Sequence, residues 1–239
     1  MQSAPLDISG IGKSYAGVPV LQDISFSLKP DEIFGLIGLN GAGKTTLIKI
    51  ILDLTRPDSG AVSLFDWQSN DIRARYNLSY LPEKFQPSRY LKGTEYLDLT
   101  LSYYGGKLDV ARAEALAEAL DLKPEVLKNR VGSYSKGMGQ KLGLVGAFLP
   151  DTSLLILDEP MSGLDPLARI RLKQQLLKEK QAGRTIFFSS HILADIEEIC
   201  DRIGVIHNGV LHYVGTPQDF KKSRSELSLE QAFLESIAA

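Results

Sequence analysis

The sequence predicts an α/β fold with a mostly parallel sheet, an antiparallel β-subdomain at the N-terminus and an inserted α-helical subdomain. Short β-branched or apolar runs alternate with longer helical patterns, which is typical of a parallel sheet covered by helices. Residues 24–28 instead alternate between apolar residues and serine, as in a half-exposed antiparallel strand. Strand signals stop between Phe85 and Pro150, which indicates the helical insertion.

Short apolar runs mark the expected strands of the main sheet. They cover residues 33–37, 154–157, 185–189, 203–206 and 210–214. Asn208 and Gly209 lie between the last two runs and predict a tight hairpin turn. A helix is expected from about residue 45 to residue 54, directly after a glycine-rich turn.

Three helical patterns fill the region without strands, at residues 93–104, 110–120 and 136–148. Near the end of the chain, Ser228 and Gln231 have the spacing of a capping box and predict a short helix. We therefore expect one domain over residues 1–220, with the core and β-subdomain at 1–84 and 151–220. The helical subdomain is expected at 85–150 and a helical tail at 221–239.

Composition limits the possible functions. The 239 residues are 44% hydrophobic, enough for one large domain with a buried core. The formal charge of -2 argues against nucleic acid as the main partner. Cys200 is the sole cysteine, so an internal disulfide and a cysteine-rich zinc site are excluded. Apolar runs of the roughly 18 to 20 residues that span a bilayer and a secretory signal are both missing, so we expect a cytoplasmic protein.

Residues 38–45, GLNGAGKT, match the phosphate-loop pattern G-x-x-x-x-G-K-[ST] between a strand and a helix. The glycines let backbone N–H groups surround phosphate oxygens without a clashing Cβ atom. Lys44 can reach the β- and γ-phosphates, and the Thr45 hydroxyl can ligate Mg²⁺. A chance glycine-rich turn would not explain the strand–loop–helix context, so the motif predicts a P-loop NTPase core that binds a nucleotide.

Asp158 and Glu159 end a run of four aliphatic residues. Ligands in open α/β sheets bind at the carboxyl ends of strands, which is also the edge of the phosphate loop. Asp158 is expected to hold Mg²⁺ through water, and Glu159 to orient or deprotonate the attacking water. Alone, the pair could equally be two solvated acids; the upstream phosphate loop favours the functional interpretation.

Ser135 and Gly137 begin the helical pattern at residues 136–148. Ser135 is a suitable N-cap, and the first turn carries no acidic residue, so this helix start could accept a second phosphate. Taken alone, an ordinary N-cap is the simpler interpretation.

These motifs, together with residues 162–165 (SGLD) and His191, occur in the order found in the nucleotide-binding subunits of ABC transporters. The chain resembles that family over roughly residues 6–217. The sequences YSKGM at residues 134–138 and YLPE at 80–83 resemble the ATPases of ABC-2 type exporters.

The resemblance implies an ATPase that works with a transmembrane permease and pairs head-to-tail with an identical or related subunit around two ATP molecules. Asp165 would join the two sites, and His191 would contact the γ-phosphate. The implied catalytic residues are Lys44, Glu159 and His191. The implied nucleotide contacts are Tyr15 (against adenine), Gly38, Asn40, Gly41, Ala42, Gly43, Lys44, Thr45, Thr46, Ser135, Gly137 and Asp165. From the residues alone, Tyr15 could equally be an ordinary tyrosine at a strand end.

Glu83 departs from the family pattern, because many members carry glutamine there. Carboxylate oxygen can still ligate Mg²⁺, but it adds negative charge near the γ-phosphate. We therefore expect Glu83 to bind the metal ion with Thr45 and Asp158, or to pair with a basic residue.

Two other function classes remain open from the sequence. A soluble ATPase of the same family, acting in iron–sulfur cluster assembly, is also a lone cassette. A small-molecule kinase with the same phosphate loop fits less well, because it has no need of the Asp158–Glu159 pair or of the YSKGM helix. A co-purifying membrane protein would favour the transporter.

Overall fold

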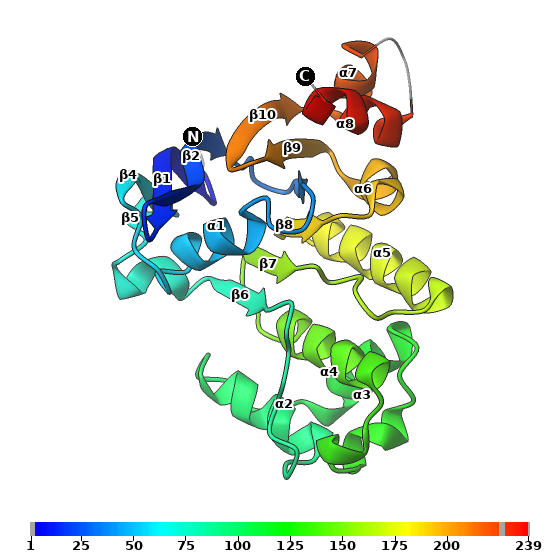
Figure 1. Ribbon diagram of the computed structural model, residues 1–239. Helices are drawn as coiled ribbons and strands as arrows, with labels where there is room; N and C mark the ends of the chain where they lie inside the picture. The colour runs from blue at the N-terminus through cyan, green and yellow to red at the C-terminus, as the bar shows by residue number, and fades with distance from the viewer. Residues whose placement is uncertain (1–2, 225–227, 239) are drawn as a thin grey trace.

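The computed structural model describes residues 3–224 and 228–238, and two sheets organise it (Figure 1). The larger sheet is parallel except for its last strand, β10, which is antiparallel to β9. In spatial order its strands are β10 (Val210–Gly215), β9 (Arg202–His207), β3 (Ile33–Ile37), β8 (Thr185–Ser190), β7 (Leu154–Asp158) and β6 (Leu78–Leu81). The predicted mostly parallel α/β core is confirmed.

The smaller sheet is antiparallel and comes from the N-terminal part of the chain, as predicted. Its order is β2 (Val18–Ser27), β1 (Asp7–Tyr15), β4 (Ser59–Leu64) and β5 (Trp67–Gln68). Ile24 and Phe26 are buried while the serines beside them are exposed, which is the alternation expected of a strand with one solvated face.

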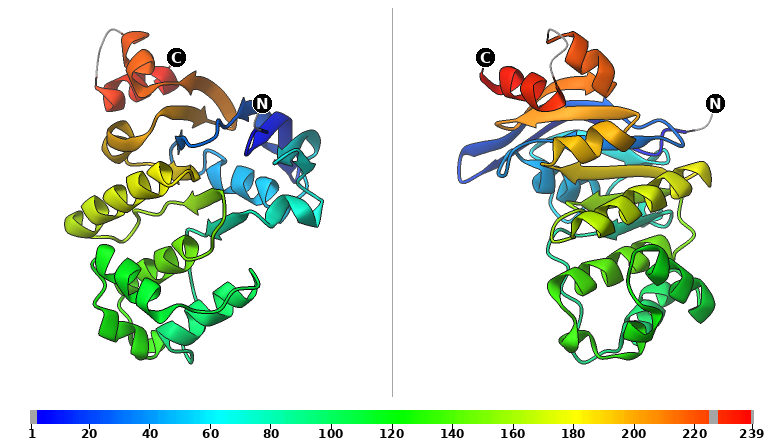
Figure 2. Two further views of the ribbon diagram at one scale, coloured as in Figure 1. Left: turned by 180° about the vertical axis from the view of Figure 1, so that it is seen from behind. Right: turned by 90° about the vertical axis from the view of Figure 1, so that its right-hand side faces the viewer.

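Eight α-helices are described: α1 (Lys44–Ile51), α2 (Gly93–Ser102), α3 (Val110–Ala119), α4 (Lys136–Phe148), α5 (Pro166–Gln181), α6 (Leu193–Ile199), α7 (Pro217–Lys222) and α8 (Leu229–Ala238). Helices α2 to α4 gather beyond β6, and α7 and α8 lie beyond β10 at the opposite end (Figures 1 and 2). Over the described ranges, no helix has the length and apolar character needed to cross a bilayer.

Each central strand contributes to two hydrophobic cores, one on either face of the large sheet. In β3, Ile33 and Ile37 join the core under the helices, whereas Phe34 and Leu36 join the core shared with the small sheet and α1. Side chains alternate in direction along a strand, so a fully apolar strand is buried on both faces. Phe34 also stacks on Phe26 of β2, with ring centroids 5.0 Å apart, which joins the two sheets.

Several element boundaries differ from the expected ones. The helix after the phosphate loop ends at Ile51, not at residue 54, because the chain turns at Asp53 with a φ of 58°. Helices α2 and α3 end slightly early, while α4 matches its predicted range. In the predicted hairpin, Asn208 and Gly209 both have positive φ, as the expected turn requires.

The terminal helix α8 begins with the predicted capping box. The Ser228 N–H donates to Gln231 Oε1 at 3.2 Å, and the Gln231 N–H donates to Ser228 Oγ at 3.3 Å. Of the predicted domain and tail ranges, residues 1–2, 225–227 and 239 lie outside the described residues. We propose the division at residues 84 and 150, which is supported by the position of α2 to α4 between β6 and β7.

Candidate functional site

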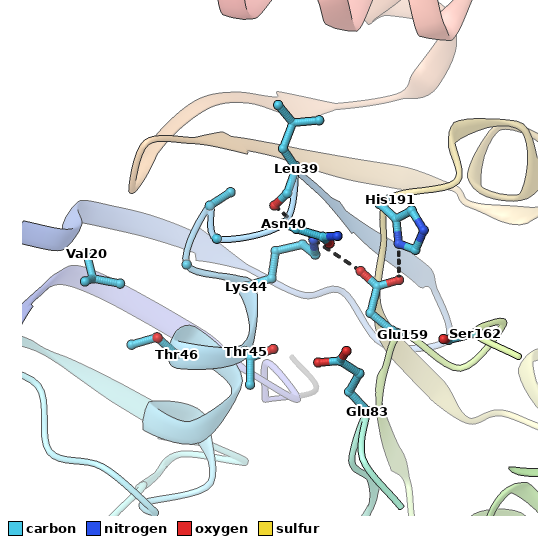
Figure 3. Close-up of a pocket in the computed structure, with 13 residues that line it drawn as sticks. Val20, Leu39, Asn40, Lys44, Thr45, Thr46, Glu83, Glu159, Ser162 and His191 are labelled. Atoms are coloured by element: carbon cyan, nitrogen blue, oxygen red, sulfur yellow. Dashed lines mark hydrogen bonds and ion pairs between the residues drawn. The ribbon is translucent and has the colours of Figure 1, made fainter. Parts of the chain in front are cut away.

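The phosphate loop connects β3 to α1 and lies against β2. Gly43 has a φ of 106°, and a Cβ atom there would lie 2.7 Å from Leu21 Cδ2 and 2.9 Å from the Val20 carbonyl oxygen. Glycine is therefore required both by the backbone conformation and by the close approach of β2. A cleft of about 380 Å³ lies over the loop (Figure 3) and is lined by Val20, Leu39, Asn40, Gly41, Ala42, Gly43, Lys44, Thr45, Thr46, Glu83, Glu159, Ser162 and His191.

Lys44 extends from the start of α1 back across the loop. Its ammonium group donates to the carbonyl oxygens of Gly38 at 2.7 Å and Leu39 at 3.3 Å. It also lies 3.2 Å from Glu159 Oε1. That last contact is an ion pair by distance, without hydrogen-bond geometry. The cation is thus held at the floor of the cleft, where a phosphate group would compete with Glu159 for it.

Glu159 directly follows β7 and lies in the opposite wall of the cleft. Its Oε2 atom lies 2.8 Å from His191 Nδ1 (Figure 3), and its backbone N–H donates to Ser189 Oγ at 2.9 Å. Its φ of 49° is in the left-handed region, which residues other than glycine seldom adopt and which is frequent at functional sites. The strand end therefore aims this carboxylate at Lys44 and His191 together.

Asp158 is fully buried behind Glu159. Ser189 Oγ donates to its Oδ1 atom at 2.6 Å, whereas Oδ2 has no hydrogen-bond partner among the described residues. Burial raises the pKa of Asp158, the hydrogen bond from Ser189 and the nearby Thr45 hydroxyl oppose the rise, and the charges of Glu83 and Glu159 add to it. An unpaired carboxylate oxygen at this place is costly unless a cation binds it.

The donor set fits a Mg²⁺ ion bound mainly through a nucleotide. Asp158 Oδ2, the Thr45 hydroxyl and the Glu83 carboxylate are the hard oxygen ligands that Mg²⁺ prefers. Burial and the negative charges of Asp158 and Glu83 together raise the pKa of Tyr80 to about 12, which places both carboxylates in one electronegative region. In residues 3–224 and 228–238, no cluster of three or more histidine, cysteine or acidic side chains forms a separate metal site.

Replacement of Asp158 by asparagine is expected to stabilise the fold. The pKa of Asp158 is higher in the folded than in the unfolded state, so the ionised carboxylate lowers the free energy of unfolding at neutral pH. This destabilisation disappears as the pH falls through the folded-state pKa toward the ordinary value of 3.8, because the carboxylate becomes protonated. Asp158→Asn should raise the melting temperature at pH 7 by about 2 to 4 °C, with a smaller gain at pH 4. Asp151→Asn, at an exposed acid, is the control in calorimetry; an unchanged or lower melting temperature for Asp158→Asn would contradict the burial argument.

Other predicted site residues lie outside this cleft. Ser135 is the N-cap of α4 and accepts from the Met138 N–H at 3.2 Å, the ordinary role that the sequence also allowed. It lines a second cleft of about 500 Å³, to which Glu83 and Ser162 also contribute. Asp165 caps α5 by accepting from the Ala168 N–H at 2.9 Å.

Gly137 and Tyr15 also lie away from the cleft wall. A Cβ atom at Gly137 would lie 3.4 Å from the Gly163 carbonyl oxygen, so the YSKGM turn packs on the SGLD turn within one chain. Tyr15 ends β1, with 47% of its surface exposed, and the Lys13 ammonium lies 5.4 Å from its ring centroid. Of the two expected roles of Glu83, pairing with a basic residue is not seen in the described part of the chain, where none of the ion pairs includes Glu83; binding of the metal ion stays a prediction.

Four contributors to the site were missed from the sequence. One is Leu39, which lines the cleft and was noted only as part of the phosphate-loop motif. Val20 reaches the cleft because β2 crosses the phosphate loop, and this contact between distant segments has no local signal. Ser162 was noted only as part of the SGLD motif. Ser189 lies inside an apolar strand, yet it bridges Asp158 and the Glu159 backbone; a serine at the carboxyl end of a strand next to the acidic strand was the available signal.

Comparison with known proteins identifies the family of this chain. The family model described as ABC transporter matches residues 21–162. The ABC-type transporter ATP-binding protein EcsA of Bacillus subtilis is 34% identical, covering 96% of this chain and 95% of its own. A Nod factor export ATP-binding protein I of Burkholderia orbicola is 35% identical over 91% of this chain and 72% of its own. A solved structure, described as an ATP binding subunit of ABC transporter, has a TM-score of 0.88 and 35% identity, covering 97% of this chain and 98% of that one.

Some relatives are longer than this chain. An uncharacterized ABC transporter ATP-binding protein of Nostoc sp. is 40% identical over 86% of this chain, but the match spans 62% of the relative. The family match nevertheless includes the phosphate loop, the YSKGM turn and the Asp158–Glu159 pair, and the EcsA match runs nearly end to end. The chain therefore belongs to the ABC transporter family, as an ATP-binding protein that carries the ATPase domain of that family.

Proposed function

We propose that this chain binds ATP with Mg²⁺ in the cleft over the phosphate loop, hydrolyses it, and so drives a separate transmembrane permease that exports a substrate. The observation that carries the proposal is the convergence of Lys44, Glu159 and His191, from three different segments, over one phosphate loop. A cation that binds the phosphates, a carboxylate base for the attacking water and an imidazole near the γ-phosphate can together support hydrolysis of a phosphoanhydride.

Lys44 and Glu159 have linked roles in this proposal. The γ-phosphate binds the Lys44 ammonium in place of Glu159, whose Oε1 atom is thereby released from the 3.2 Å ion pair. Glu159 then holds the attacking water and accepts its proton, while His191, 2.8 Å from the other carboxylate oxygen, contacts the γ-phosphate. Thr45, Asp158 and Glu83 would hold Mg²⁺, which neutralises charge that develops on the phosphate oxygens.

The second cleft supports a head-to-tail pair of ATPase subunits, either two identical chains or this chain and a related one. Ser135 begins a 13-residue helix whose first turn carries no acidic residue, so it can accept an anion from outside the chain. Glu83 and Ser162 line both clefts, which supports a site in which the two proposed nucleotide contacts lie close together. Tyr15 is proposed to stack on adenine.

The loop after Glu83 is the proposed contact with the permease, at the cytoplasmic face of a membrane. Phe85 packs on Tyr96, with ring centroids 5.3 Å apart, so it serves the fold of the helical subdomain. Tyr90 is 85% exposed and lies beside an open groove of about 840 Å³ that also includes Arg130. The direction of transport is supported by the YSKGM and YLPE sequences and by the name of the Nod factor export relative.

Affinity purification tests the proposed partner. Tagged Glu159→Gln protein is expected to bring down a polytopic membrane protein in stoichiometric amount, when host membranes are solubilised in mild detergent with ATP. Mass spectrometry identifies the partner, and Tyr90→Ser provides a variant whose capture should be weaker at unchanged ATP affinity. A soluble scaffold in place of the membrane protein would contradict transport and favour a soluble assembly ATPase.

A further inference from the structure

His191 lies just before the N-terminus of helix α6. The helix begins at Leu193, two residues after the histidine, and is 7 residues long. Its N-cap is Ile192, which has no side-chain oxygen to satisfy the first turn. Because such a short helix has little stability of its own, the position of His191 depends on the surfaces against which α6 packs.

A buried ion pair attaches the first turn of α6 to α5. Asp195 has 9% of its side chain exposed, and its Oδ1 atom lies 3.4 Å from Lys173 Nζ, whose side chain is 12% exposed. Lys173 also contacts the carboxylate of Glu198, one turn later. Burial works against the charge of Lys173, yet the carboxylates of Glu198 and Asp195 raise its pKa above the ordinary value, so it is protonated at neutral pH.

The pair is not easily exchanged for another arrangement. The second oxygen of Asp195 is buried and has no hydrogen-bond partner within the described residues. Lys173 is therefore the cation on which that carboxylate depends, and loss of one partner of a buried pair is far more disruptive than loss of both. The contact fixes α6 at its first turn, the end from which His191 projects.

The N-terminal end of α5 lies at the SGLD turn, and Lys173 lies near the middle of the helix. Asp165 caps α5 by accepting from the Ala168 N–H, and Lys173 follows eight residues later, about 12 Å along the helix axis. A single rigid helix therefore joins the turn that contains Asp165 to the ion pair that holds α6.

We propose that Lys173 is a positioning residue for His191, which it holds against Glu159 through Asp195 and the first turn of α6. Lys173 itself touches no reacting atom. The inference rests on the proposed function insofar as His191 takes part in ATP hydrolysis. It also extends that function, because α5 would transmit the position of the Asp165 turn to the histidine.

The test uses Lys173→Met, which retains the apolar stem and removes the charge. The chain has three histidines, so ¹⁵N-histidine labelling resolves the His191 ring signals by NMR without nucleotide. We expect Lys173→Met to shift these signals toward those of Glu159→Gln, in which the 2.8 Å contact is altered. The matched control is Lys180→Met, which removes another ion pair of α5, with Asp201, and should leave the signals in place.

Kinetics provide the second readout. Lys173→Met should lower kcat by up to about 100-fold, the cost of misplacing a catalytic group by about 1 Å, with the ATP dissociation constant unchanged. Lys173→Arg should restore kcat. If Lys173→Met does not fold, the double variant Lys173→Met/Asp195→Leu, which leaves no unpaired buried charge, is judged by the same NMR and kinetic criteria.

Unshifted His191 signals in a folded variant would overturn the positioning role, and so would an equal loss of ATP affinity and kcat. Shifted signals with unchanged hydrolysis would instead contradict the part of the proposed function that assigns His191 to catalysis. The two failures are therefore distinguishable.

Discussion

Glu159→Gln is expected to lower kcat by about 10²- to 10⁴-fold, the range for loss of a general base, while the ATP dissociation constant changes less than about threefold. Glutamine retains the shape of the side chain but cannot accept the proton of the attacking water. ATP binding is expected to be preserved because the proposed phosphate contacts of Lys44 do not need Glu159, and loss of the Lys44–Glu159 ion pair removes a competitor of the phosphate.

Phosphate release under single-turnover conditions measures the rate, and displacement of a fluorescent nucleotide measures the affinity. With ATP, the variant should elute from size-exclusion chromatography as a dimer. Glu125→Gln, at an exposed position, is the control and should hydrolyse ATP normally. A rate within tenfold of the unmodified protein would assign the attacking water to another group.

Lys44→Ala is expected to weaken ATP binding by about 10- to 150-fold, because a hydrogen bond to a charged group contributes about 1.5 to 3 kcal/mol and each 1.4 kcal/mol is a factor of about ten. The ammonium is positioned by the carbonyl oxygens of Gly38 and Leu39, so no other described side chain of the loop can supply the charge at this place. Hydrolysis should fall with the occupancy of the cleft.

Lys49→Ala is the matched control, because Lys49 lies on the exposed face of the same helix α1. Isothermal titration with a non-hydrolysable ATP analogue compares the two variants, and the melting temperature of each confirms that it is folded. Equal affinities for Lys44→Ala and Lys49→Ala would show that Lys44 does not contact the phosphates.

Most strands of the large sheet could be predicted because each contains a short, largely apolar run. Other elements lacked such a signal. β1 contains Gly10 and Gly12 and pairs with irregular register, so it shows no clean alternation. α5 is the longest described helix, but only four of its 16 residues are buried. Because most of its residues are polar, the apolar stripe is weak in the sequence. β6 becomes a core strand only through pairing with β7, 76 residues away.

The parts of the candidate site that could be predicted are those whose positions are set by the ends of the parallel strands. The phosphate loop and the Asp158–Glu159 pair lie at the ends of predicted strands, so their meeting at one edge of the sheet follows from the parallel fold. Contacts that depend on side-chain geometry were not predictable. Examples are the bridge from Ser189 to Asp158 and the approach of Glu159 to both Lys44 and His191.

The stacked phenylalanines that join the two sheets imply that the walls of the cleft differ in stiffness. Phe26, Phe34 and α1 belong to one continuous core, so the wall formed by β2 and the phosphate loop cannot open without exposing aromatic surface to water. Besides Glu159 and Ser162, the facing wall includes His191, on the turn before α6, and Glu83, on the exposed loop after β6. Conformational change on nucleotide binding is therefore expected in the wall that carries His191 and Glu83. The wall formed by β2 and the phosphate loop is expected to stay fixed.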